Sequence, residues 1–149
     1  MFSLISYLQI RALEKMSKFE NLRSLTDLTE AEIAHLKEHC FARMVEVGTH
    51  LLYMGRDSNN YSQTTFDFRG IRYHMYRHQL SLYLKKYDDP TFDMASWDNS
   101  LTTSHLCHKK RCVNPAHLEL ESMDTNKERE NCFAQNVCHH HDAAPDCLI

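Results

Sequence analysis

The 149-residue sequence lacks any long apolar run, and no segment of it repeats. We therefore expect no transmembrane span and no repeat architecture. The first residues, MFSLISYLQIRALEK, have no basic segment ahead of a short apolar stretch that Arg11 interrupts, so they do not resemble a signal peptide. These absences predict an intracellular protein with reduced thiols and no membrane partner.

The region 88–149 is poor in aliphatic runs, so apolar burial alone would stabilise it weakly. The same region holds five of the six cysteines, several of them near histidines. Three disulfides are the alternative interpretation, with 15 connectivities and an oxidising compartment. Because a disulfide framework needs no histidine, the pattern favours zinc in place of missing apolar burial.

An excess of positive charge is also absent, since 17 basic residues stand against 20 acidic ones. The distribution of charge matters more than its sum for a nucleic-acid partner. Five basic residues and no acidic one lie between Arg69 and Lys86, and the stretch 99–118 lacks any carboxylate while carrying Lys109, Lys110 and Arg111. These clusters could neutralise phosphates; a solvated helix face is the alternative.

The segment SHLCHKKRCVNPAHLELESMDTNKERENC contains a C-x4-C-x4-H pattern formed by Cys107, Cys112 and His117. Two thiols and an imidazole so close together are typical zinc ligands. A fourth ligand is needed, and the distant Cys40 is a better candidate than His108, which lies inside the loop. A second, complete set follows in Cys132, Cys138, His140 and Cys147, where His139 or His141 could replace His140.

Two residues of this segment suit phosphodiester hydrolysis instead of zinc binding. A strand over residues 101–106 would place His105 beside the metal loop, where a neutral imidazole could accept a proton from water. Residues 118–121 would return as the partner strand, followed by a helix over 123–133. Asn126, in the first turn of that helix, would face His105, and its side-chain oxygen could bind Mg²⁺.

With these residues in register from His105 to Cys132, the segment resembles the His-Cys box homing endonucleases, a branch of the ββα-metal (His-Me finger, HNH-like) nucleases. The resemblance implies His105 as general base and Asn126 as the ligand of a catalytic Mg²⁺. It also implies two structural Zn²⁺ ions, the first held by Cys107, Cys112, His117 and an upstream cysteine that Cys40 would match.

The resemblance further implies double-stranded DNA as partner, a nuclear location if the host is eukaryotic, and an arginine ahead of the box that holds the scissile phosphate. Arg69 and Arg72 both lie near the expected place. A homodimer is implied as well, through a surface other than an exchanged tail because only two residues follow Cys147. A hairpin of strands 49–56 and 61–68, joined by the turn 57–60, would enter the major groove with Tyr61, Gln63 and Thr65, or else face solvent.

The rest of the chain is interpreted as scaffold. A capping box at Thr29 and Glu32 predicts a helix ending at Gly48, and a second helix is expected from Gly70 to Tyr87. Residues 1–24 are apolar and helical in pattern. The predicted fold is a single α+β domain over 1–149, with a helical part (1–48), a hairpin and basic helix (49–87) and a zinc-bound ββα region (99–149) flanked by helices around a small antiparallel sheet.

We therefore predict a Mg²⁺-dependent DNA endonuclease in which one catalytic cation works with a histidine base. Two alternatives stand beside it. One is a non-catalytic zinc module that binds nucleic acid or protein, although such a module needs neither His105 nor Asn126. The other is a sequence-nonspecific DNase or RNase built on the same finger.

Overall fold

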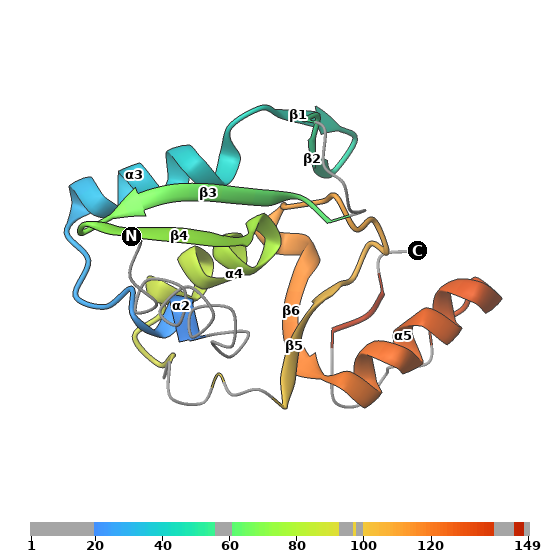
Figure 1. Cartoon of the computed structure of the whole chain (residues 1–149). Helices are drawn as coiled ribbons and strands as arrows, with labels where there is room; N and C mark the ends of the chain where they lie inside the picture. The colour runs from blue at the N-terminus through green and yellow to red at the C-terminus, as the bar shows by residue number, and fades with distance from the viewer. Residues whose placement is uncertain (1–19, 56–60, 93–96, 98–99, 139–144, 148–149) are drawn as a thin grey trace, which may run out of the picture.

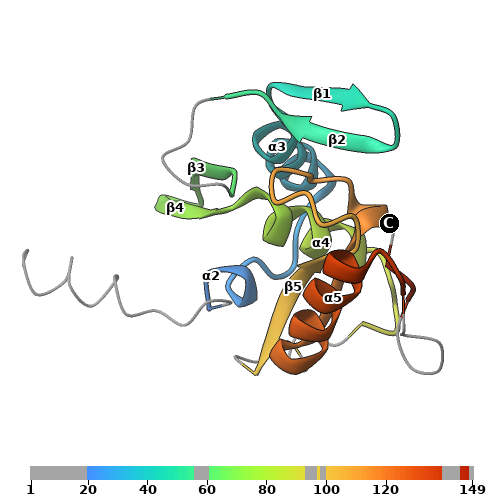
Figure 2. The same ribbon diagram turned by 90° about the vertical axis from the view of Figure 1, so that its right-hand side faces the viewer.

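The computed structural model describes most of the chain, namely residues 20–55, 61–92, 97, 100–138 and 145–147. In this part three two-stranded antiparallel sheets pack with helices, as Figures 1 and 2 show, which confirms the predicted α+β class. The short helix α2 (Glu20–Arg23) comes first. Most of the stretch predicted to be helical over 1–24, and all of the predicted turn 57–60, lie outside the described residues.

A ββα unit forms the C-terminal half of the described chain. Strand β5 (Leu101–His105) pairs antiparallel with β6 (Leu118–Ser122), with His105 opposite Leu118. Helix α5 (Met123–Gln135) starts directly after β6, because the Ser122 hydroxyl accepts the Thr125 backbone N–H and caps the helix. The helix packs against both strands, and Figure 2 shows it beside β5. The predicted strand, strand and helix are thereby confirmed to within a residue or two at their ends.

Helix α3 (Glu30–Phe41) begins with the predicted capping box but ends seven residues before Gly48. The chain then forms a hairpin of β1 (Met44–Val47) and β2 (His50–Tyr53). Strand β2 also bonds to the loop between β5 and β6, where the Val113 N–H donates to the Leu51 carbonyl at 2.8 Å. Residues 44–47, which were expected in the helix, instead pair with β2, and β2 in turn is held by this distant loop.

The expected pairing of strands 49–56 and 61–68 is wrong. Instead β3 (Gln63–Phe68) pairs with β4 (Ile71–Tyr76) around the turn Arg69–Gly70, where both residues have positive φ, 48° and 77°. Two successive positive φ values define the tight turn that suits the twist of a hairpin. The predicted helix from Gly70 therefore loses its first turns to β4 and survives only as α4 (Arg77–Tyr87).

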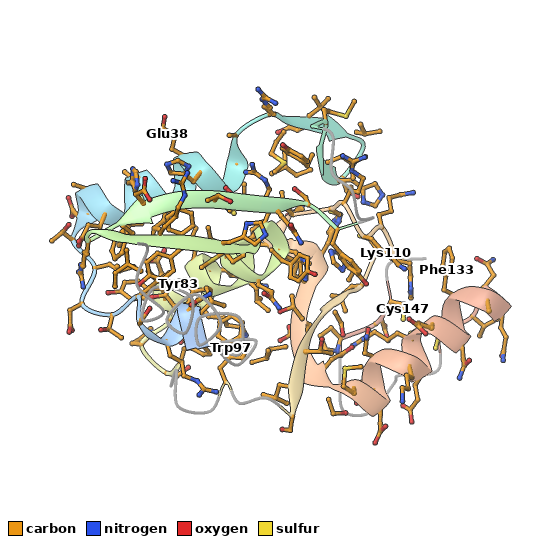
Figure 3. The ribbon with its side chains drawn as sticks, in the orientation of Figure 1. Glu38, Tyr83, Trp97, Lys110, Phe133 and Cys147 are labelled. Carbon is orange, nitrogen blue, oxygen red and sulfur yellow. The ribbon has the colours of Figure 1, made fainter. Side chains whose placement is uncertain are left out.

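Helix α4 lies at the centre of the molecule and packs against α3, β4, β5 and β6. Its side chains from Arg77 to Leu84 are all buried. They join a core that includes Leu36, Phe66, Tyr83, Trp97 and Leu118, in which the Tyr83 and Trp97 rings lie 6.3 Å apart (Figure 3). The basic residues of this region thus do not form one solvated helix face.

None of the described helices is both long and apolar enough to cross a membrane.

Candidate functional site

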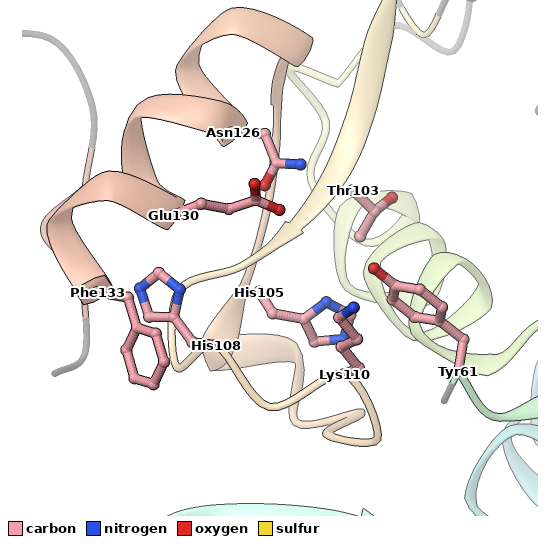
Figure 4. A pocket seen from close by; sticks show the side chains of 8 residues that line it. All are labelled: Tyr61, Thr103, His105, His108, Lys110, Asn126, Glu130 and Phe133. Atoms are coloured by element: carbon pink, nitrogen blue, oxygen red, sulfur yellow. The ribbon is translucent and has the colours of Figure 1, made fainter. Parts of the chain in front are cut away.

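A pocket opens between β5, the loop that follows it and α5 (Figure 4). The two residues expected to carry the chemistry, His105 and Asn126, both line it. His105 is the last residue of β5, and Asn126 lies in the first turn of α5. Because α5 follows β6 without a linker, the hairpin fixes where both side chains stand.

The His105 ring is oriented by a backbone carbonyl. Its Nε2 lies 3.1 Å from the Cys112 carbonyl oxygen. Since a carbonyl only accepts, Nε2 must carry the hydrogen, which leaves the Nδ1 lone pair available as a base. Burial lowers the pKa of His105 to about 4, so the ring is neutral at neutral pH. The His78 ring at 4.8 Å and the Tyr61 ring at 5.9 Å enclose it further.

Asn126 connects the helix to the hairpin. Its Oδ1 accepts a hydrogen bond from the Ser104 hydroxyl at 2.9 Å, and Ser104 is the neighbour of His105 on β5. A carboxamide oxygen has two lone pairs, so one remains for a hard cation. The hydrogen bond therefore sets the amide in place with an oxygen still able to bind a metal ion.

Four candidate zinc ligands converge beside the pocket. The ligand atoms of His50, Cys107, Cys112 and His117 all lie within 4.8 Å of one another, three of these residues being buried and His50 half-buried. His50 begins β2, whereas the others come from the loop between β5 and β6 and its 3-10 turn, Pro115–His117. Two sulfurs and two imidazoles from three segments form the tetrahedral donor set typical of structural zinc.

The two sulfurs lie close enough to share a proton. A hydrogen bond from the Cys107 thiol lowers the pKa of Cys112 and raises the pKa of Cys107. Ionisation of Cys112 is thereby favoured, and the thiolate is the form that binds metal. The residues present fit Zn²⁺.

The prediction of Cys40 as the fourth ligand is wrong. Its fully buried thiol points into the core near α4, donates to the Arg77 carbonyl at 3.4 Å and lies outside the ligand group. Burial raises the pKa of Cys40 to about 12, which disfavours the thiolate. His50 takes the place instead. No local spacing in the sequence marks His50, because only the pairing of β2 with the distant loop brings it there.

A second group forms between α5 and the C-terminal segment. The sulfurs of Cys132, Cys138 and Cys147 lie within 4.8 Å of one another. Arg129 braces this group: it is buried in an ion pair with Glu121 at 2.7 Å and donates to the Cys147 sulfur at 3.5 Å. Three of the four predicted ligands are thus together. The fourth, His140, and its alternatives His139 and His141 lie outside the described residues.

Neither arginine expected at the scissile phosphate lies at the pocket. Arg69, in the β3–β4 turn, forms an ion pair with Glu32 at 2.7 Å and also donates to the Thr26 and Asp27 carbonyls. Arg72 is exposed, 4.0 Å from Asp67. The turn closes one end of the hairpin. Gln63 lies at the other end, and that end is near Tyr61 and the pocket. Sequence proximity to the box misled here because the hairpin carries both arginines away from it.

Lys110 is the cation that lines the pocket among the described residues. Its ammonium lies 5.5 Å from the centre of the Tyr61 ring, within range of a cation–π contact. It belongs to the basic loop between Cys107 and Cys112, so the zinc-ligand group also fixes the base of the segment that carries it. The sequence marked Lys110 only as one member of this cluster.

A short antiparallel hairpin, a zinc-type loop inside it and a helix that faces back to the terminal histidine define a zinc-stabilised ββα-metal, or His-Me finger, fold. The family model described as the zinc-binding loop region of homing endonuclease matches residues 49–148. This match covers about two thirds of the chain, and the protein belongs to that family. The matched region begins just before His50 and ends just after Cys147, so it contains every member of both ligand groups. The resemblance noted in the sequence is thereby confirmed.

Proposed function

We propose that the protein is a Mg²⁺-dependent endonuclease that hydrolyses phosphodiester bonds of double-stranded DNA. One observation carries the proposal: a neutral imidazole with an available Nδ1 and a carboxamide oxygen line the same pocket. A non-catalytic zinc module has no use for this pair. Membership of the homing endonuclease family supports the same reading.

In the proposed reaction His105 Nδ1 takes a proton from a water molecule as the water oxygen attacks phosphorus. The bond from phosphorus to the leaving sugar oxygen breaks, and that oxygen is protonated from solvent. Mg²⁺ held by Asn126 would neutralise charge on the phosphate and on the leaving oxygen. The Cys112 carbonyl keeps the ring in the tautomer that can accept the proton.

We assign the phosphate contact to Lys110 rather than to Arg69 or Arg72. A lysine is a compact point charge on a flexible stem and is well suited to a phosphate oxygen. Lys109 and Arg111 flank it in the same loop, so neighbouring phosphates could be neutralised as well.

The exposed face of β3–β4 is the proposed surface for base contacts in the major groove. Gln63 and Thr65 alternate along β3 with the buried Thr64 and Phe66, so they share the outer face. On β4 the exposed His74 lies opposite Thr65 and its Nδ1 is 2.8 Å from the Thr65 hydroxyl. Side chains with donors and acceptors on a hairpin of this width can reach base edges. Tyr61 lines the pocket instead of this face.

We further propose two structural zinc ions, one at each ligand group, with His140 completing the second. The chain is also proposed to act as a homodimer, which would present two pockets to the two DNA strands.

The test is incubation of the zinc-loaded protein with supercoiled plasmid and, separately, with single-stranded RNA, with and without Mg²⁺. Discrete plasmid fragments that require Mg²⁺ are the expected result. A smear would indicate nonspecific degradation instead of site-specific cutting. Cleavage of RNA alone would indicate that RNA, and not DNA, is the substrate. No product under any condition would contradict the proposal and leave a binding module.

A further inference from the structure

Glu130 lies one helical turn beyond Asn126 on α5 and lines the same pocket. Residues four apart on a helix share a face. Figure 4 shows the Glu130 carboxylate beside the Asn126 amide, with both groups directed to the side of the pocket where His105 stands. The pocket therefore presents a carboxylate as well as an amide oxygen.

The Glu130 carboxylate has few contacts that would explain it as a purely structural residue. Within the described residues the Glu130 side chain has no ion pair and no hydrogen bond, and its negative charge acts on the His108 ring, whose pKa it raises against the larger effect of burial. The guanidinium next to it in sequence, Arg129, points the other way and is paired with the buried Glu121. Apart from this charge interaction, no contact among the described residues accounts for an acid at this place.

The chemistry of the pocket gives the acid a role. An amide oxygen is a neutral and weak ligand, and Mg²⁺ in proteins is commonly bound through one or two carboxylates while it keeps several waters. We propose that Glu130 binds the divalent cation together with Asn126. The inference rests on the proposed function, because it concerns the same cation, and it deepens it by adding a charged ligand to the site.

A carboxylate that binds the cation acts on DNA in opposite ways with and without metal, whereas a side chain that only packs does not. Without a cation, the Glu130 carboxylate faces the position of the scissile phosphate and repels it. With a cation bound, the same carboxylate helps to hold the charge that attracts the phosphate. Removing the acid should therefore weaken cation binding while strengthening DNA binding in the absence of divalent ions.

The experiment uses Glu130→Gln, which keeps size and removes the charge, in the zinc-loaded full chain. Glu128→Gln is the matched control, because Glu128 is an exposed acid of the same helix that does not line the pocket. Mn²⁺ binding is followed by electron paramagnetic resonance and DNA binding by fluorescence anisotropy in buffer free of divalent ions. Zinc content and Tm establish that each variant is folded.

For Glu130→Gln we expect Mn²⁺ affinity to fall on the order of ten-fold or more and metal-free DNA binding to tighten, while Glu128→Gln matches wild type in Mn²⁺ affinity. A folded Glu130→Gln with wild-type Mn²⁺ affinity, alongside an Asn126→Ala variant that loses Mn²⁺, would overturn the role of Glu130 and leave the proposed function standing. A wild-type protein that binds no Mn²⁺ and cuts no DNA would instead end the proposed function.

Discussion

His105 is oriented by the loop that also carries the zinc-type ligands. Its Nε2 contacts the carbonyl of Cys112, and the Cys112 sulfur belongs to the ligand group. A single residue thus serves two sites, through its backbone and its side chain. Metal at the loop would act on the proposed base by fixing this carbonyl.

Substitutions at His50 and Cys40 separate the observed ligand group from the one expected. His50→Ala should lower the zinc content of the protein, because it removes one of the four converging ligand atoms. Cys40→Ser should leave zinc content unchanged, because its thiol lies in the core. Zinc is measured by mass spectrometry of the purified variants. Equal zinc in wild type and His50→Ala, with less in Cys40→Ser, would reverse the assignment.

Lys110→Ala should slow cleavage about ten- to hundred-fold, as expected for losing a hydrogen bond to a charged group worth ~1.5–3 kcal/mol. Lys109→Ala provides the control, since Lys109 lies in the same loop but does not line the pocket. Both variants lose one positive charge, so both should weaken DNA binding to a similar degree. If the two variants cut DNA at the same rate, Lys110 has no special role at the scissile phosphate.

Local spacing was sufficient to find the residues of the ββα unit. Cys107, Cys112 and His117 lie on one loop, and His105 and Asn126 flank it at distances set by a hairpin and a helix start. His50 could not be found in this way, since its place depends on β2 pairing with that loop. The arginine prediction failed for a related reason: which end of a hairpin faces a site is a tertiary property.

At the scale of elements, the N-terminus of α3 is tied to the β3–β4 turn by charge. Glu32 caps the Thr29 backbone N–H and pairs with Arg69 across the two elements. Arg69 has a positive φ of 48°, which a residue other than glycine adopts at some strain. The ion pair and the two carbonyl contacts of its guanidinium hold this turn closed.

The Glu32–Arg69 pair makes stability depend on pH. The hydrogen bond from Arg69 lowers the pKa of Glu32 from 4.5 to about 2. A depressed carboxyl pKa in the folded state contributes stability above pH 4.5, and this contribution is lost as the pH falls toward 2. Glu32→Gln keeps a capping side chain but removes the charge. Urea unfolding should therefore find the variant less stable than wild type at pH 7, with a gap that narrows below pH 4.5; a gap independent of pH would contradict the ion pair.

Element types were predictable where a pattern was complete within one segment. The capping box predicts the start of α3, and α5 begins at the residue where the sequence predicts a helix after the second strand. The sequence pattern does not predict these hairpins, because residues 44–53 and 71–76 carry apolar side chains that fit either a helix or a strand period. Whether such a segment forms a helix or a strand is decided by pairing with a neighbour. Strand β2 pairs with the loop between β5 and β6, and β4 pairs with β3 around Arg69–Gly70.

At the scale of the whole molecule, the fold depends on two kinds of stabilisation. The core around α4 is apolar and aromatic, whereas the β2 contact with the zinc loop and the C-terminal contact with α5 centre on ligand groups. A structural zinc contributes about 10–16 kcal/mol in model peptides, comparable with the ~5–15 kcal/mol net stability of a domain. Metal at these places would therefore decide whether the outer segments stay folded.

Removing zinc with a chelator should release these segments before the core. Hydrogen exchange followed by mass spectrometry should find faster exchange in β2 and in the loop from Cys107 to Val113, whose backbone bonds connect the two. Exchange in α4, which the core buries, should change less. Unchanged exchange in β2 after complete zinc loss would show that the apolar core alone holds this contact.

In the proposed mechanism His105 and Asn126 act on one phosphodiester bond. The most direct measurement is Mg²⁺-dependent cleavage of supercoiled plasmid by wild type and His105→Ala, both at matched zinc content and saturating DNA. We predict a fall in cleavage rate of about 10²–10⁴-fold, the usual worth of a general base, with DNA affinity unchanged. Cleavage by His105→Ala at the wild-type rate would contradict it.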